Sequence, residues 1–153
     1  EGRNACMAAK MGWDVTAFDY SQEGVDKALK LASEMEVNIT FTCCDYQDFS
    51  IENKFDVVGL IYAHMPNRKS FHQVALDHLK SGGTLILEGF HKKQLGKSSG
   101  GPQKLEMLYD EQELQEDFEA LEALRIWETQ THLTEGLYHV GDAEVIRVIG
   151  TKS

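Results

Sequence analysis

Two short apolar segments, each followed by an aspartate, constrain the fold of this chain more than any other feature. Residues 15–18 form a run that ends at Asp19, and residues 37–44 form a second run that ends at Asp45. Such runs are typical of buried strands. Ser21 can cap a helix after the first run, because apolar residues then recur at helical spacing. A strand that ends in a carboxylate and continues directly into a helix is half of a βαβ unit.

The segments around these runs continue the alternation of helices and strands. Asn4 can cap a helix that ends before Gly12, and residues 55–61 are nearly continuous apolar sequence, typical of a parallel strand covered on both faces. A helix with Pro66 in its first turn and a strand at 84–87 follow. The sequence therefore predicts an α/β fold, a Rossmann-like, doubly wound and mostly parallel sheet.

The last third of the chain departs from this alternation. Residues 89–109 predict a long loop, of which residues 96–102 are Gly/Ser-rich. A loop of this length in a compact domain is usually functional or disordered. Asp110 and Glu113 form a capping box for a short acidic helix. Two long strands at 124–133 and 143–151 predict an antiparallel hairpin at the edge of the sheet.

Chain length and net charge limit the classes of function that the protein can have. The 153 residues suit a single domain over residues 1–153, with a formal net charge of -10 and a pI near 5.0. This charge argues against nucleic acid or an anionic membrane as a partner, because both are bound through clustered Lys and Arg. We expect a small-molecule partner, and the sequence leaves the oligomeric state open, a homodimer included.

The cysteines and histidines predict no metal centre. Cys6, Cys43 and Cys44 lack the spacing of a disulfide framework or a metal site, which favours reduced thiols in a cytoplasmic protein. The spacing of His91, His132 and His139 likewise matches no compact ligand motif.

Asp19 and Asp45 are the main candidate binding residues. Successive parallel strands end at the same edge of a sheet, so both carboxylates should project from one edge, where open α/β sheets bind ligands. One can accept hydrogen bonds from ribose hydroxyls and the other from the exocyclic amino group of a purine. The alternative is that Asp19 belongs to a solvated turn before a helix.

With these acids in place, the chain resembles a class I S-adenosylmethionine-dependent methyltransferase, in particular the small single-domain group of tellurite-resistance and thiopurine methyltransferases. The matching segments follow the family's order: Glu1-Gly2-Arg3-Asn4 for the end of the glycine-rich motif, residues 15–21 for the acidic second strand, Cys44-Asp45-Tyr46 for the adenine turn, residues 55–58 for the fourth strand, residues 79–83 for the Gly-Gly turn with Ser81 in place of proline, and Gly100-Gly101-Pro102.

The resemblance implies S-adenosylmethionine as cofactor. It implies that the backbone at Gly2 approaches the cofactor and that Arg3 and Asn4 continue into the helix. It also implies that Asp19 binds the ribose and that Tyr20 packs on the adenine.

The resemblance assigns further contacts to the next strands. Asp45 would accept a hydrogen bond from the adenine amino group, and the backbone amide of Tyr46 would bond a ring nitrogen. Ile61, with Tyr62, would line the floor beneath the cofactor.

The sequence says less about the residues that would bind the methyl acceptor. His64, just past a predicted parallel strand, is the best-placed candidate general base, and the alternative is that it packs or caps the following helix. Candidate walls of the acceptor pocket share an aromatic or imidazole ring: Tyr62, Phe90, Tyr109, Tyr138 and His139. For these aromatic residues the alternative is simple packing.

The sequence differs from the family pattern in one respect, and it also allows two other functions. The family's first strand is absent, and a chain without it would fold poorly and be inactive, so we expect residues before Glu1 in the complete protein. A nicotinamide dinucleotide oxidoreductase also suits an acid after the second strand, although Asp45 and the hairpin speak against it. A non-catalytic cofactor-binding domain is the other alternative.

Overall fold

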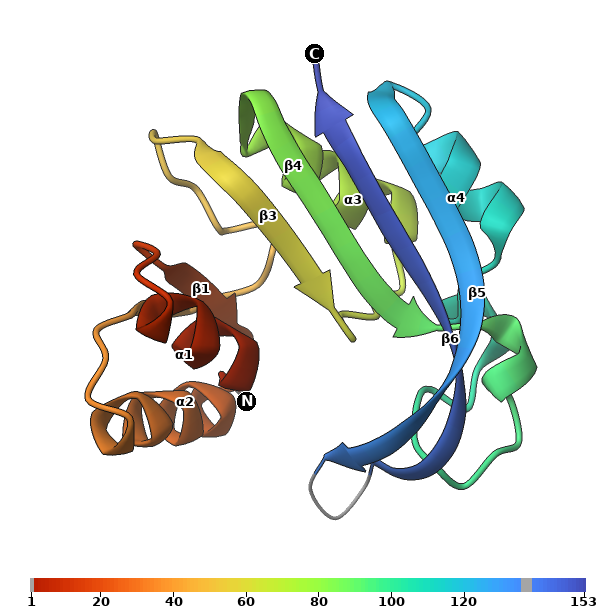
Figure 1. The fold of residues 1–153 in the computed structure, drawn as a ribbon, viewed down its shortest axis with the longest axis horizontal. Coiled ribbons are helices and arrows are strands. Elements are labelled where there is room, and N and C mark those ends of the chain that lie inside the picture. The colour runs from red at the N-terminus through yellow and green to blue at the C-terminus, as the bar shows by residue number, and fades with distance from the viewer. Residues whose placement is uncertain (1, 136–138) are drawn as a thin grey trace. The chain divides into compact units, whose positions relative to one another are not determined.

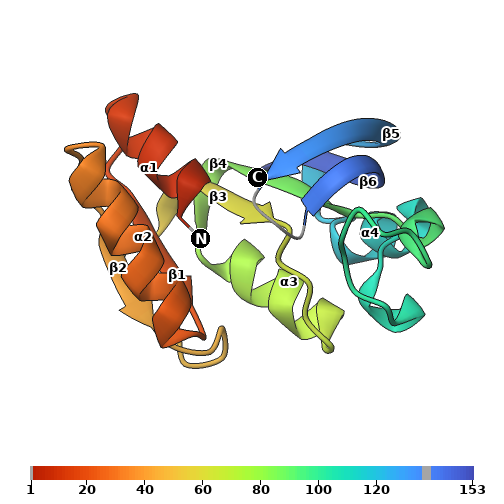
Figure 2. The same cartoon turned by 90° about the horizontal axis from the view of Figure 1, so that it is seen from below.

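The computed structural model describes residues 2–135 and 139–153, with the side chains at 135 and 139 left aside. These residues gather into two compact units, Glu1–Ile51 and Glu52–Ser153. The expectation of a single domain over residues 1–153 stays a prediction. Figures 1 and 2 show the elements of both.

The first unit is a pair of parallel strands with two helices. Its elements are α1 (Arg3–Lys10), β1 (Thr16–Asp19), α2 (Gln22–Glu34) and β2 (Thr40–Cys43). Strand β1 pairs with β2 in parallel register, and α2 connects them, as the sequence predicts for a βαβ unit. Helices α1 and α2 meet at the buried residues Cys6 and Ala28.

The helix termini in this unit follow local chemistry. The Ser21 side chain accepts a hydrogen bond from the Gly24 N–H at the start of α2, which confirms the predicted cap. Gly12 follows α1 with a positive φ of 96°, a conformation that favours glycine. The predicted cap at Asn4 is wrong: Gly2 is the N-cap of α1, and Asn4 already lies in the first turn.

The second unit is a four-stranded sheet with the order β3-β4-β6-β5. Its elements are β3 (Phe55–Ile61), α3 (Arg68–Asp77), β4 (Leu79–Phe90), the short 3-10 helices η1 (Lys92–Gln94) and η2 (Leu105–Met107), α4 (Glu111–Asp117), β5 (Leu121–Glu135) and β6 (His139–Lys152). Strands β3 and β4 are parallel, whereas β6 is antiparallel to both β4 and β5. Helices α3 and α4 lie on one face of this sheet (Figures 1 and 2).

The antiparallel hairpin lies at one edge of the sheet as predicted, with β5 outermost and β6 paired with β4. Two other details of this sheet differ from the prediction. Strand β4 starts at Leu79, before the predicted residue 84, because the ladder resumes around a bulge at the Gly-Gly turn. In β3, Leu60 is buried and the other residues are partly buried or exposed, whereas the sequence predicts a strand covered on both faces.

The Gly/Ser-rich loop is anchored by Gln94. The buried Gln94 amide donates to Ser99 Oγ at 2.8 Å and to the Gly100 carbonyl at 3.0 Å, and its oxygen accepts from the Glu144 N–H. Ser99 Oγ in turn donates to the Asp142 carbonyl. The loop therefore takes its shape from buried hydrogen bonds to β6, since buried polar groups must be paired.

Candidate cofactor-binding site

The two predicted acids lie at the same end of the parallel strands. Asp19 is the last residue of β1 and is opposite Cys43 in β2, and Asp45 follows two residues later. The Cys44 N–H donates to the Asp19 carbonyl at 3.0 Å, so the two chain segments stay adjacent beyond the ladder. The predicted common edge is thereby confirmed.

Both carboxylates are bonded to local backbone and remain accessible. Asp19 Oδ1 accepts from the Ser21 N–H at 2.9 Å, and this side chain is half-buried. Asp45 is exposed, and its Oδ1 accepts from the Gln47 N–H at 3.0 Å. Because a carboxylate offers about four lone-pair sites, each can still accept hydrogen bonds from a ligand.

Gly2, the N-cap of α1, lies directly against Ala28 of α2. Its φ is +83°, and a Cβ at this position would lie 2.5 Å from the Cβ of Ala28. Glycine is therefore required by the packing of α1 on α2, whatever else its backbone contacts. Arg3 and Asn4 follow as exposed residues of the first helical turn.

The two tyrosines next to the acids have different environments. Tyr20 is 73% exposed and its ring is available to a planar ligand, whereas Tyr46 is 5% exposed and belongs to the core. The Tyr46 hydroxyl accepts from the Gln47 side-chain amide at 3.1 Å. Only the backbone of Tyr46 therefore remains as a candidate contact, which is the contact that the family resemblance implies.

In the second unit, Ile61 and Tyr62 stand at the carboxyl end of β3. Tyr62 has a φ of +52°, and its hydroxyl donates to Glu88 at 2.6 Å. Glu88 also pairs with Arg147 of β6. Ile61, Glu88 and Arg147 border a shallow recess of about 220 Å³ on the sheet. Its full lining is Ile61, Ile86, Leu87, Glu88, Trp127, Arg147, Val148 and Ile149.

Both ring nitrogens of His64 are engaged with the backbone. Nδ1 lies 2.6 Å from the Met107 carbonyl, to which it donates, and Nε2 accepts from the Phe90 N–H at 3.0 Å. The ring also stacks on Tyr109 with centroids 4.6 Å apart. Burial lowers the pKa of His64 to about 4. The imidazole is thus neutral and uses its lone pair in a structural hydrogen bond.

The other predicted acceptor residues are packed. Phe90 and Tyr109 are each 2% exposed, so their rings do not wall an open pocket, and the packing alternative holds for both. The Tyr109 hydroxyl donates to the Ala63 carbonyl at 2.8 Å. Tyr138 and the side chain of His139 lie outside the described residues.

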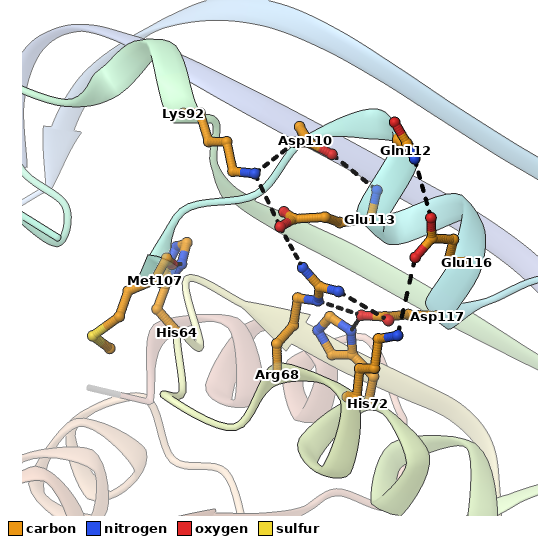
Figure 3. Close-up of polar contacts among 11 residues, drawn as sticks. His64, Arg68, His72, Lys92, Met107, Asp110, Gln112, Glu113, Glu116 and Asp117 are labelled. Carbon is orange, nitrogen blue, oxygen red and sulfur yellow. Dashed lines mark hydrogen bonds and ion pairs between the residues drawn. The ribbon is translucent and has the colours of Figure 1, made fainter. Parts of the chain in front are cut away.

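A buried polar cluster joins α3 to α4 (Figure 3). Asp117 accepts from Arg68 Nε at 2.6 Å and from His72 Nδ1 at 2.7 Å, and its side chain is 1% exposed. Arg68 also pairs with Glu113, which in turn pairs with Lys92. Burial alone would raise the pKa of the Asp117 carboxyl, but the bonds from His72 and Arg68 keep that pKa below its ordinary value. No local signal reveals this cluster, because the residues of α3 that it contains lie more than forty positions from their partners in α4.

Several solved structures share the fold of this chain, one of them an N-methyltransferase. TehB from Haemophilus influenzae superposes with a TM-score of 0.77 at 17% identity, over 99% of this chain and 54% of that chain. The YcgJ protein from Bacillus subtilis gives a TM-score of 0.76 at 15% identity, over 99% and 87%. The N-methyltransferase NodS from Bradyrhizobium japonicum, in complex with S-adenosyl-L-homocysteine, gives 0.71 at 11% identity, over 99% and 72%.

Sequence comparison then identifies the family. The model of the methyltransferase domain family matches residues 1–83, which is more than half of the 153 residues. No curated protein sequence matches the chain. The chain therefore belongs to the methyltransferase domain family. Its Rossmann-like fold is the one that the solved structures above share. It spans about half the length of TehB, 54%.

Proposed function

We propose that this chain transfers a methyl group from S-adenosylmethionine to a small-molecule acceptor, with Asp19 and Asp45 holding the adenosine part of the cofactor. The observation that supports this most is the parallel register of β1 and β2, which places both acids at one edge. The family and its fold supply the class of reaction.

The residues at this edge fit an adenosine. Asp19 and Asp45 are accessible acceptors that suit ribose hydroxyls and an amino group, and the exposed ring of Tyr20 suits a purine face. Gly2, Arg3 and Asn4 are proposed to border the cofactor through the start of α1, and the Tyr46 amide to bond the adenine. The roles of Ile61 and Tyr62 stay predictions.

The bound cofactor supplies an activated methyl group on a sulfonium, which an acceptor can take by in-line displacement. The chain's own residues then have to bind and orient, because positioning accounts for most of the rate in such a reaction. Carboxylates at the site also favour a cationic ligand.

Calorimetric titration with S-adenosylhomocysteine and with NAD tests the proposal. We expect saturable binding of S-adenosylhomocysteine and none of NAD at the same concentration. The reverse result would support the oxidoreductase alternative. Binding of S-adenosylhomocysteine without methyl transfer to a broad panel of small acceptors would support the non-catalytic one.

For His64 we propose a positioning role in place of the predicted general base. Its Nε2 would have to release the Phe90 N–H before it could take a proton. A base role predicts that His64→Ala keeps cofactor affinity and lowers turnover roughly 10²-fold or more. A positioning role predicts a lower unfolding midpoint, with turnover of the folded fraction changed much less. Measuring both quantities on the same preparation separates the two roles.

We also propose a cytoplasmic location. The three cysteines are unpaired, which suits a reducing compartment. Within the described residues, no helix has the length and apolar character needed to cross a membrane. Localisation of a tagged full-length protein, by microscopy or fractionation, tests this.

A further inference from the structure

A glycine lies directly against the Asp19 carboxylate. Gly24 is in the first turn of α2, and its N–H donates to the capping Ser21 Oγ at 3.3 Å. A Cβ built on Gly24 would lie 2.7 Å from Asp19 Oδ2, 2.8 Å from Cγ and 3.2 Å from Oδ1. The carboxylate therefore occupies the space that any other residue at position 24 would fill.

The backbone does not explain this glycine. Gly24 is helical and is absent from the glycines of positive φ, so alanine is conformationally allowed there. Glycine inside a helix is less stable than alanine. What Gly24 provides is room for Asp19, whose carboxylate can then reach the Ser21 N–H at 2.9 Å.

We propose that Gly24 is a positioning residue for cofactor binding, because it lets the Asp19 carboxylate lie on the first turn of α2 in the orientation that binds the ribose. This inference rests on the proposed function and adds to it a residue that does not itself touch the cofactor. Gly24→Ala keeps the charge at Asp19 but turns the carboxylate away from the Ser21 N–H.

The variant should separate affinity from stability. A methyl group at position 24 favours the helix, while the displaced carboxylate loses one local hydrogen bond, so the unfolding midpoint should change little. We expect the affinity for S-adenosylhomocysteine to fall about tenfold, since misplaced charge-assisted hydrogen bonds are lost. A glycine with a purely structural role would not produce this combination.

A double-mutant cycle tests whether Gly24 affects cofactor affinity through Asp19. Affinities for S-adenosylhomocysteine are measured calorimetrically for the wild-type chain, Gly24→Ala, Asp19→Ala and the double variant. If Gly24 acts through Asp19, Gly24→Ala weakens binding about tenfold in the wild type and not at all when Asp19 is already alanine. Ser33→Ala, an exposed change in the same helix, is the matched control for helix propensity and should leave the affinity unchanged.

The possible outcomes distinguish the role of Gly24 from the proposed function. Wild-type affinity for Gly24→Ala, or an equal loss in both backgrounds, would overturn the role of Gly24 while leaving the proposed function intact. Absence of S-adenosylhomocysteine binding to the wild-type chain would overturn the proposed function and this inference with it.

Discussion

The two units use the same side chain in opposite ways. In the first, Asp19 is half-buried and accepts a backbone N–H, with lone pairs still accessible. In the second, Asp117 is 1% exposed and is paired with Arg68 and His72. An aspartate that is hydrogen-bonded only to nearby backbone can still receive a ligand, whereas one paired with side chains of another helix holds two helices together. Position and partners, more than residue type, separate a candidate binding group from a structural one.

The largest test of this contrast is Asp117→Ala. Removing the carboxylate leaves His72 buried without this partner, while Arg68 keeps Glu113. Breaking a buried pair typically costs about 3–5 kcal/mol. We expect that loss in the free energy of unfolding, measured by urea denaturation. Asp56→Asn, which breaks the exposed pair with Lys80, is the control and should leave the midpoint unchanged. A loss no larger than that of the control would mean that the cluster does not hold α3 to α4.

The converse test is Asp19→Asn. If this carboxylate binds the ribose, the variant should bind S-adenosylhomocysteine roughly ten- to a hundredfold more weakly, the equivalent of about 1.5–3 kcal/mol for hydrogen bonds to a charged group. The unfolding midpoint should stay close to that of the wild type. Asp14→Asn changes an exposed aspartate just before the same strand and should have no effect on binding. Equal affinities of the two variants would remove Asp19 from the site.

His64 should make stability depend on pH. Its pKa is about 4 in the folded chain and 6.5 ordinarily, so the folded state binds fewer protons between these values. The stabilisation is complete above pH 6.5 and declines as the pH falls toward 4. From pH 7 to pH 5 we expect a loss of about 2 kcal/mol in unfolding free energy. His64→Gln should remove most of this difference, and an unchanged pH dependence in that variant would assign it to other groups.

The smallest expected effect concerns Asp45. Its side chain is exposed, so a single hydrogen bond to the adenine amino group should contribute little net energy. Asp45→Asn is expected to weaken S-adenosylhomocysteine binding roughly three- to tenfold. Comparing adenosine with inosine as competing ligands sharpens the test, since inosine lacks the amino group. If Asp45 makes this contact, the variant discriminates less between the two nucleosides than the wild type does.

Much of the fold follows from local patterns in the sequence. The order of helices and strands is the predicted one, and the strand at 55–61 has the predicted boundaries. The caps at Ser21 and Asp110 also form as predicted. These features depend on residues a few positions apart, so periodicity and capping chemistry can reveal them.

Local sequence patterns predict only part of the candidate site. The common edge of Asp19 and Asp45 follows from parallel pairing and is found. The environment of His64 could not be foreseen, because Met107 and Phe90 reach it from 43 and 26 residues away. Gly24 did leave a signal, a glycine inside a helix, but its meaning needs the position of the neighbouring carboxylate.

By itself, the sequence determined the alternation of elements and the placement of two acids at one edge, since side-chain periodicity and strand direction are local properties. Only the tertiary structure decided which polar groups stay accessible and which are engaged within the protein. Asp117 is paired with Arg68, the His64 ring is hydrogen-bonded to backbone, and Gln94 is hydrogen-bonded to its own loop. The physical reason is that burial and pairing are set by residues distant along the chain, whose approach no short pattern encodes.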